Sequence, residues 1–464
     1  MSFNLPKTEK KRVVIVGGGF GGLKLANKLK KSNFQVVLVD RNNYHQFPPL
    51  IYQIASAGIE PSSISFPFRK IFQKRKNFFF RMAEVRSIFP EHKILQTSIG
   101  KVKYDYLVLA AGTTTNFFGN QHIAEEAMPM KNVSEAMGLR NALLDNFERA
   151  LTCAGEQERQ ELLNVVIVGG GATGVEIAGA LSEMRNYVLP KDYPDLPSSL
   201  MHIYLVEAGP RLLSAMSPET SEHVEKYLRN MGVNVLLNKM VTDYKDHRVF
   251  LKDGSSIATR TFIWVSGVAA EPVGNLGNEH LGRGHRIVVD EFNRVKGFDN
   301  IFSIGDQCIM PDADPAYPNG HPQLAQVAIQ QGALLARNLK ALDEGKELKP
   351  FRYKNLGTMA TVGRNRAVAE FKEIKMYGFL AWVMWLVVHL RSILGVRNKI
   401  IVLFNWMWNY FSYSQSLRMI IYAKKAKEVI EREKRLASTH WGTDLMSEGS
   451  EDTRENQRPT SSKS

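Results

Sequence analysis

Two stretches of the chain repeat the same order of apolar and polar positions. In the first, the apolar run RVVIV (12–16) leads into GGGFGGLKLANKLKK, and a second apolar run, FQVVLVD (34–40), follows. In the second, NVVIVGGGATGVEIAGALSEM begins at residue 164, and MHIYLVEAG ends at residue 209 after a longer connection. Apolar runs rich in β-branched residues predict buried strands, and the stretch between them predicts a helix. The chain therefore contains two β-α-β units, which indicates a duplication at the scale of a domain.

Three further segments extend this pattern. YDYLVLAAGTTTN (104–116) and TFIWVSGVAAEP (261–272) join an apolar run to a turn of small residues, and NIFSIGDQC (300–308) ends in Gly-Asp-Gln-Cys. The expected fold class is therefore α/β with two Rossmann-like domains, the second inserted into the first. We expect a tail over 1–10, a first domain in two parts over 11–128 and 285–371, an inserted domain over 129–284, C-terminal membrane-binding helices over 372–436 and a disordered tail over 437–464.

The first glycine-rich turn has the spacing of a dinucleotide-binding site. Gly17, Gly19 and Gly22 satisfy G-x-G-x-x-G between a predicted strand and a predicted helix. Positions without a side chain let the backbone turn tightly and approach a pyrophosphate, which then meets N–H groups at the helix N-terminus. Asp40 ends the next strand, where a carboxylate accepts hydrogen bonds from a ribose. A purely structural strand–helix turn is the alternative, and the terminal acid argues against it.

The second unit carries the same fingerprint at Gly169, Gly171 and Gly174, with Glu207 at the end of its second strand. A carboxylate at that point favours a free 2′-hydroxyl and repels a 2′-phosphate, so NADH is expected rather than NADPH. The alternative for Glu207 is an ordinary exposed acid at a strand end. Two dinucleotide sites in one chain fit a flavin and a nicotinamide cofactor.

Composition excludes several other classes of protein. The chain has 464 residues, of which 44% are hydrophobic, and a formal net charge of +14. A largely disordered chain is excluded by that apolar content, and the two cysteines, Cys153 and Cys308, are too few for a disulfide scaffold. The cysteines form no C-x-x-C, and no metal site is expected. No nucleic-acid motif accompanies the positive charge. The polar N-terminus has no apolar run typical of a secretory signal, so we expect a cytoplasmic location.

Several motifs occur in the order typical of one flavoprotein family. RNNYHQFPPLIYQIASAGIEP follows the first acid, and SIGDQ, LAQVAIQQG, GTMATVGRNRAVAE and the Trp-rich end beginning GFLAW come later. With these motifs the chain resembles the type II NADH dehydrogenases (NADH:quinone oxidoreductases), flavoproteins with two dinucleotide-binding domains. The resemblance covers about residues 11–420. It implies FAD in the first domain, NADH in the inserted domain and a membrane quinone as the electron acceptor.

The resemblance also implies individual site residues. Those expected at FAD are Gly17, Gly19, Phe20, Gly21, Gly22, Asp40, Arg41, His45, Val85, Ala111, Gly112, Asp306, Ala325 and Lys375. Those expected at NADH are Gly169, Gly171, Gly174, Glu207 and Gly267. The resemblance assigns the catalytic surroundings to Glu176, Gln326 and Gln330.

Each catalytic assignment has a plainer alternative. A carboxylate at Glu176 is expected to hydrogen-bond the nicotinamide carboxamide or to influence proton uptake, whereas the helix dipole alone also favours an acid in a first turn. Gln326 and Gln330 are four residues apart and share one helix face, where uncharged amides suit the carbonyls of a quinone. The alternative for this pair is two polar surface residues. Cys308 invites comparison with sulfide:quinone oxidoreductases, which use cysteine pairs, but it is more simply a small buried residue.

The C-terminal part of the chain is apolar without being long enough to span a membrane. Residues 376–390 are uncharged but short of the ~20 residues that a spanning helix needs, and residues 400–417 contain several Asn, Ser and Gln. Four of the six tryptophans lie here, at Trp382, Trp385, Trp406 and Trp408. The nearby basic residues are Arg391, Arg397, Lys399, Arg418, Lys424, Lys425 and Lys427. Tryptophans at headgroup level and basic residues for anionic lipid predict helices that lie on the membrane. Burial of the same helices in a homodimer is the alternative, and the two are compatible.

The sequence therefore predicts a monotopic, non-pumping NADH:quinone oxidoreductase with non-covalent FAD, bound to the cytoplasmic face of a bacterial inner membrane. Its expected partners are NADH, a membrane quinone, an anionic lipid surface and a second copy of the chain. Two alternatives stay open. One is a flavin-bound membrane scaffold or redox-responsive binding protein, and the other is an NADH-dependent reductase of a protein acceptor.

Overall fold

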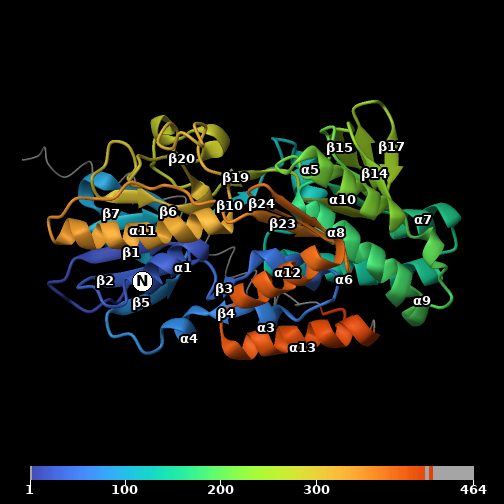
Figure 1. Cartoon of the computed structure of the whole chain (residues 1–464), viewed down its shortest axis with the longest axis horizontal. Helices are drawn as coiled ribbons and strands as arrows, with labels where there is room; N and C mark the ends of the chain where they lie inside the picture. The colour runs from blue at the N-terminus through green and yellow to red at the C-terminus, as the bar shows by residue number, and fades with distance from the viewer. Residues whose placement is uncertain (1–2, 413–416, 422–464) are drawn as a thin grey trace, which may run out of the picture. The chain divides into compact units, whose positions relative to one another are not determined.

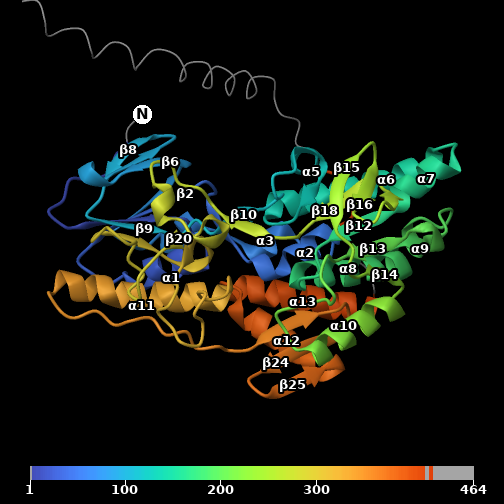
Figure 2. The ribbon, with the colours of Figure 1, turned by 90° about the horizontal axis from the view of Figure 1, so that it is seen from above.

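The first domain is built on a five-stranded parallel sheet. The computed structural model describes residues 3–412 and 417–421, and Figures 1 and 2 show the arrangement of its elements. The strand order is β21-β9-β1-β2-β5. The strands are β1 (Arg12–Val16), β2 (Gln35–Asp40), β5 (Phe78–Met82), β9 (Tyr106–Leu109) and β21 (Ile301–Ser303). Because β21 comes from the far side of the second domain in the sequence, that domain is an insertion.

The inserted domain repeats this architecture. Its parallel sheet has the order β11-β18-β12-β13-β14. The strands are β11 (Met128–Pro129), β12 (Val165–Val168), β13 (Ile203–Val206), β14 (Val233–Leu236) and β18 (Thr261–Trp264). Each sheet places its glycine-rich turn after a central strand, β1 or β12. The predicted α/β fold with one Rossmann-like domain inserted in another is confirmed.

Short antiparallel sheets complete the molecule. They are β3 (Tyr44–Gln46) with β4 (Ser65–Pro67), β6 (Val85–Phe89) with β7 (Ile94–Thr97) and β8 (Gly100–Lys103), β15 (Val241–Lys245) with β16 (Arg248–Leu251) and β17 (Ser256–Ala258), and β23 (Thr358–Thr361) with β24 (Ala367–Phe371) and β25 (Ile374–Tyr377). The chain leaves the first domain along β10 (Thr113–Thr115) and returns along β19 (Val268–Ala270), and these two strands pair with each other. A two-stranded ribbon therefore joins the domains. A small parallel pair is formed by β20 (Ile287–Val288) and β22 (Cys308–Ile309).

Helices cover the sheets and extend toward the C-terminal end. They are α1 (Phe20–Lys28), α2 (Ile51–Ala55), α3 (Pro61–Ile64), α4 (Phe68–Phe72), α5 (Gln121–Glu126), α6 (Val133–Thr152), α7 (Glu156–Leu163), α8 (Ala172–Glu183), α9 (Leu189–Asp192), α10 (Pro218–Asn230), α11 (Ala325–Asp343), α12 (Gly378–Ser392) and α13 (Val396–Ser412). On one face of the first sheet, Val13 and Ile15 pack with residues of α1 and α11 such as Leu25 and Leu335, and all four are fully buried. This packing fixes the N-termini of α1 and α11 beside the carboxyl ends of the strands.

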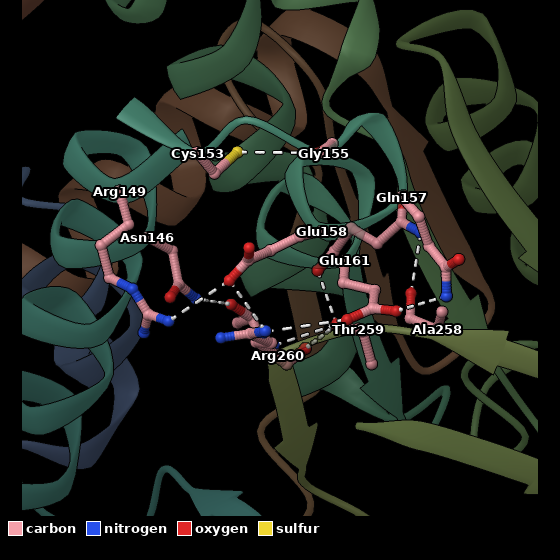
Figure 3. A network of polar contacts seen from close by, with 12 residues as sticks. Asn146, Arg149, Cys153, Gly155, Gln157, Glu158, Glu161, Ala258, Thr259 and Arg260 are labelled. Carbon is pink, nitrogen blue, oxygen red and sulfur yellow. Dashed lines mark hydrogen bonds and ion pairs between the residues drawn. The ribbon is translucent and has the colours of Figure 1, made fainter. Parts of the chain in front are cut away.

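A polar network fixes the outer helices of the inserted domain (Figure 3). The guanidinium of Arg260 pairs with Glu158 at 3.1 Å and with Glu161 at 3.8 Å, both on α7. The backbone N–H of Arg260 also donates to the Glu161 carbonyl at 2.8 Å. Asn146 of α6 donates its side-chain amide to Thr261 Oγ1 of β18 at 2.9 Å. These contacts hold α6 and α7 against the strand that leads back to the ribbon.

Helices α12 and α13 lie side by side in both views (Figures 1 and 2). Each presents one exposed apolar face. The exposed residues are Phe379, Leu380, Val383, Val387 and Val388 on α12, and Ile400, Leu403, Phe404, Met407, Trp408 and Phe411 on α13. Among the described residues, no helix is both long and apolar enough to cross a membrane. The expected disordered tail and the basic residues beyond position 421 lie outside the described residues.

The tryptophans of this region divide between the surface and the interior. Trp408 is 67% exposed, whereas Trp385 is 1% exposed. Trp406 donates its indole N–H to Gln53 of α2 at 2.9 Å. Trp382 stacks on Tyr410 of the neighbouring helix, with the ring centroids 5.6 Å apart. Local sequence cannot distinguish these cases because the helix face that packs inward is decided by tertiary contacts.

Candidate functional site

A large cleft of about 970 Å³ lies between the two Rossmann-like domains and α12. The first domain contributes the glycine-rich turn, Asp40, Val85, Ala111, Gly112, Asp306 and Ala325 to its wall. The inserted domain contributes Ala172, Thr173 and Glu176 of α8. The C-terminal region contributes Met359 and His389. The cleft therefore collects predicted residues from both halves of the duplication.

The first glycine turn is shaped by close approach of backbone to backbone. A Cβ atom at Gly22 would lie 1.9 Å from the Gly17 carbonyl oxygen, so no side chain fits there. At Gly19, by contrast, a Cβ would meet nothing within 4 Å, because this position faces open space. The Gly18 N–H donates to the Asp40 carboxylate at 2.6 Å, which ties the turn to the end of β2. The result is an open backbone cradle at the N-terminus of α1, suited to a phosphate group.

The second glycine turn repeats the close contacts of the first. The Gly170 N–H donates to the Glu207 carboxylate at 2.6 Å, as Gly18 does to Asp40. A Cβ at Gly174 would lie 1.9 Å from the Gly169 carbonyl oxygen, and the space beside Gly171 is open. The glycines of this turn, Glu207 and Gly267 are outside the cleft wall, which begins at Ala172 of the helix that the turn opens.

Charges in the cleft fit a bound dinucleotide. Asp306 follows β21, and its carboxylate makes no hydrogen bond to the described residues. Burial raises the pKa of Asp306, and the charges of Lys131 and Arg286 oppose that rise. Lys131 lines the cleft wall as well, and burial lowers its pKa, against the charges of Asp306 and Glu135. An unpaired acceptor and a basic side chain beside an open glycine cradle suit the hydroxyls and phosphates of FAD.

Other residues expected at FAD are arranged in different ways. Phe20 and His45 line the cleft, and the His45 Nδ1 donates to the Gly18 carbonyl at 2.9 Å. Arg41 also lines the cleft and pairs with Glu271 at 3.2 Å. Lys375 lies elsewhere: it is on β25, and its ammonium group pairs with Glu219 of α10 at 2.8 Å. Lys375 is not part of the cleft wall, so its expected contact with FAD has no support in this structure.

Glu176 stands on α8 where the inserted domain meets the cleft. Burial raises its pKa to about 8, against smaller opposing effects of the Thr361 backbone and the Trp385 indole. The side chain is therefore a neutral carboxylic acid at neutral pH, not the carboxylate that the sequence suggested. A neutral acid is able to donate a proton or a hydrogen bond into the cleft.

Gln326 and Gln330 do share one face of α11, but their amides are already engaged. Gln326 donates to the Gly357 carbonyl at 2.9 Å and accepts from the Leu356 N–H at 2.9 Å. Gln330 donates to the Lys354 carbonyl at 2.9 Å and accepts from the Lys354 N–H at 3.0 Å. Neither side chain lines the cleft. The pair holds the segment that leads into β23, and that strand carries Met359 into the cleft wall and Thr361 toward Glu176.

A chain of hydrogen bonds connects helix α13 to the cleft. Trp406 donates to Gln53 at 2.9 Å, and the Gln53 amide donates to the Tyr52 hydroxyl at 3.0 Å. Tyr52 lines the cleft, and its pKa is raised well above 10 by burial and by the nearby Glu176. The hydroxyl therefore keeps its proton beside the acid.

Several residues of the cleft wall are not predicted by the sequence, among them Lys131 and His389. Lys131 lies at the start of the predicted inserted domain, in a segment without a motif. His389 carried a weak signal, since it is the histidine within the uncharged run 376–390. The apolar pattern of this run predicts a membrane-facing surface, whereas His389 on the same helix lines the cleft.

Comparison with known proteins identifies relatives over nearly the whole chain. Residues 11–332 match the family described as pyridine nucleotide-disulphide oxidoreductase, and residues 355–412 match the NDH2 C-terminal domain. The chain is similar to the type II NADH:quinone oxidoreductase NdhA of Mycobacterium tuberculosis, with 33% identity over 91% of this chain and 93% of that protein. It is also 33% identical to the type II NADH:quinone oxidoreductase of Haemophilus influenzae, over 78% of this chain and 87% of that one.

Solved structures share the fold. NDH2 of Plasmodium falciparum in complex with NADH superposes with a TM-score of 0.81 at 20% identity, covering 89% of this chain and 100% of that chain. The sulfide:quinone oxidoreductase of Aquifex aeolicus gives a TM-score of 0.67 at 18% identity, covering 87% of this chain and 96% of that one. At these identities both likenesses are of fold alone. In this chain the buried Cys308 thiol donates to the Gly305 carbonyl at 3.4 Å, and Cys153 caps the C-terminus of α6.

Proposed function

This chain belongs to the type II NADH:quinone oxidoreductases, and from that membership we propose how its own residues oxidise NADH and reduce a quinone. The reaction takes a hydride from NADH and one proton from solvent, and it yields NAD⁺ and a hydroquinone. When bound, FAD supplies hydride acceptance and two-electron transfer. The protein supplies binding, orientation and the proton.

The observation that carries the proposal is the composition of the cleft wall. The glycine cradle and Asp306 come from one domain, and Glu176 comes from the N-terminal part of α8 in the other. Helix α12 closes the remaining side with His389. One cleft thus brings together the residues proposed for the flavin, the residue proposed beside the nicotinamide and a helix whose outer face is apolar.

We assign the residues as follows. Gly17, Gly19, Phe20 and Gly21 form the cradle for the FAD pyrophosphate, Asp40 and Arg41 hold its adenosine ribose, and Val85 presents backbone to the adenine. Ala111, Gly112, Asp306 and Ala325 bound the remainder of the cofactor, with His45 supporting the cradle. Gly169, Gly171, Gly174, Glu207 and Gly267 hold NADH. Glu176 donates the proton that quinone reduction consumes.

Gln326 and Gln330 are positioning residues in this scheme. Their amides hold residues 354–357, and through that segment they set the position of β23 beside Glu176. This role replaces direct hydrogen bonds to the quinone, because both amides are engaged by backbone groups of the chain and neither side chain lines the cleft.

The exposed apolar faces of α12 and α13 support peripheral binding to a membrane, from which a lipid-soluble quinone enters. We propose that anionic lipid adds to this attraction through Arg391, Arg397 and Lys399, that the protein sits on the cytoplasmic side of a bacterial inner membrane, and that it forms a homodimer. Sedimentation with vesicles of neutral or anionic phospholipid, and light scattering of the detergent-purified protein, test the lipid and dimer proposals separately.

Anaerobic stopped-flow spectroscopy tests the proposed reaction. The protein as purified with its flavin is mixed first with NADH and then with duroquinone, a tetramethyl benzoquinone. We expect NADH to bleach the visible flavin absorbance and the quinone to restore it. Bleaching without recovery would refute the quinone half-reaction and favour a protein acceptor or a scaffold. Equal bleaching rates with NADPH would contradict the assigned role of Glu207.

A further inference from the structure

His389 closes the cleft on the side of α12. Ala381, Trp385 and His389 are spaced four residues apart, so they lie on one face of this helix. Ala381 and Trp385 are buried, and His389 lines the cleft. The opposite face carries exposed Leu380 and Val387. The imidazole therefore stands on a single-helix wall between the cleft and an apolar surface.

The hydrogen bond of His389 fixes which ring nitrogen carries the proton. Nδ1 lies 2.8 Å from the Trp385 carbonyl oxygen. A carbonyl oxygen only accepts, so Nδ1 must be the donor and must carry the hydrogen. In the neutral ring, Nε2 then holds a lone pair and acts as an acceptor.

The surroundings of the ring keep it neutral and oriented. The imidazole stacks on Trp385, with the ring centroids 4.1 Å apart. It also packs edge to face with Phe47, with the ring centroids 6.3 Å apart. Burial among these groups lowers the pKa of His389 to about 4, although the bond to the Trp385 carbonyl opposes that change. The ring is thus uncharged at physiological pH, and its most distal atom, Nε2, has no hydrogen-bond partner among the described residues.

An acceptor without a proton discriminates between the two forms of a quinone. The oxidised form offers only carbonyl oxygens, which cannot donate to a lone pair, whereas the reduced form offers two hydroxyl groups that can. We propose that Nε2 of His389 accepts a hydrogen bond from a hydroxyl of the reduced quinone, so that this residue favours the hydroquinone over the quinone in the site.

This inference rests on the proposed function and adds a recognition element to it. The glycine cradle and α8 occupy the other sides of the cleft, so the α12 side is the one left for a ligand that arrives from an apolar phase. The interaction forms only as the quinone is reduced, so it contributes to turnover rather than to capture of the oxidised substrate.

Two substitutions separate the roles of the two ring nitrogens. His389→Asn keeps an amide near the position of Nδ1, able to donate to the Trp385 carbonyl, and removes the acceptor at Nε2. His389→Gln reaches farther and places an amide oxygen near the position of Nε2. His92→Asn, in an exposed turn of the first domain, is the matched control.

The measurement is equilibrium binding of probes to each oxidised, FAD-loaded protein by anaerobic fluorescence titration. The probes are duroquinone, durohydroquinone and the dimethyl ether of durohydroquinone, which lacks both hydroxyl donors. In His389→Asn we expect the Kd for durohydroquinone to rise about 5- to 10-fold, the range for one lost hydrogen bond. The Kd values for the quinone and the ether should change less than about twofold. His389→Gln should restore most of the hydroquinone affinity.

Equal weakening of all three probes in His389→Asn would overturn the proposal and assign His389 a role in shape only. Unchanged binding of all three would also overturn it. Should His389→Asn lose its flavin, the unmodified protein still provides a test, since it must bind durohydroquinone more tightly than the ether. Bleaching by NADH and recovery with quinone are measured separately, so failure of the proposed function is distinguishable from failure of this inference.

Discussion

Replacing Glu176 with glutamine removes one titrating group from the cleft while keeping its size. The parent side chain has a pKa raised to about 8 by burial. Protonated acid is then about 90% of the population near pH 7 and about 10% near pH 9. If the protonated form is the proton donor, quinone reduction in the parent protein should slow roughly ninefold over that interval.

The assay is the quinone half-reaction in a stopped-flow instrument, with flavin already reduced by NADH, followed across this pH range. Glu176→Gln should reoxidise more slowly than the parent and show no pH dependence in the interval, while bleaching by NADH stays close to the parent rate. Glu183→Gln is the matched control, since it makes the same substitution two turns later on α8. Burial raises the pKa of Glu183 as well, with Arg364 and Arg366 opposing the rise.

The same shift has a consequence for stability with a defined sign. The folded-state pKa of Glu176 lies above its ordinary value of 4.5, so the folded protein holds this proton more tightly than the unfolded chain does. The shifted pKa of Glu176 therefore does not lower the free energy of unfolding at pH values below about 4.5. It lowers that free energy progressively as the pH rises toward 8. Urea unfolding should show that Glu176→Gln is more stable than the parent near pH 8.

A rate of quinone reduction in the parent protein that is flat between about pH 7 and 9 would refute the proposed proton donor. A pH dependence of that rate that persists in Glu176→Gln would refute it as well.

Three further outcomes follow from the packing. Gly22→Ala should yield protein without flavin absorbance, because its Cβ would lie 1.9 Å from a carbonyl oxygen. Gly19→Ala, where the space is open, should still fold. Retained flavin in Gly22→Ala would contradict the proposed cradle. Arg260→Gln should lower the free energy of unfolding, measured in urea, by about 1–2 kcal/mol, because Glu161 loses its cation. An unchanged midpoint of urea unfolding would show that the network of Figure 3 contributes little to stability. Phe404 on α13 has a side chain that is 63% exposed. Phe404→Asp should lower the affinity for anionic vesicles more than tenfold, as measured by co-sedimentation. Equal binding of the variant and the parent would exclude this face as the membrane contact.

Both dinucleotide turns were predictable from sequence because their determinants are local. Strand, turn and helix follow each other without interruption, and the acids Asp40 and Glu207 end the neighbouring strands. The close approach at Gly22 and Gly174 is a property of that turn wherever it occurs, so the motif alone specifies the cradle.

The third side of the cleft was less predictable because distant segments decide it. Gln326 and Gln330 were expected to face a quinone, but residues 354–357 supply the partners for both amides. Lys375 was expected at FAD, but Glu219, 156 residues earlier, draws it to another surface. The apolar pattern of 376–390 correctly indicated an exposed face, yet it gave no sign that the other face of this helix carries His389 into the cleft.

The two copies of the dinucleotide turn differ in how far the cleft wall surrounds them. The two turns have the same backbone and the same carboxylate bond, so the turns themselves do not distinguish FAD from NADH. The difference lies in what surrounds them. The first cradle is part of the cleft wall, to which Lys131 and Asp306 also belong. The second turn lies outside that wall, and only the start of its helix α8 belongs to the wall. Enclosure on many sides slows dissociation, and an open turn permits it. This asymmetry therefore favours a flavin that stays bound in the first domain and a nicotinamide that exchanges at the second.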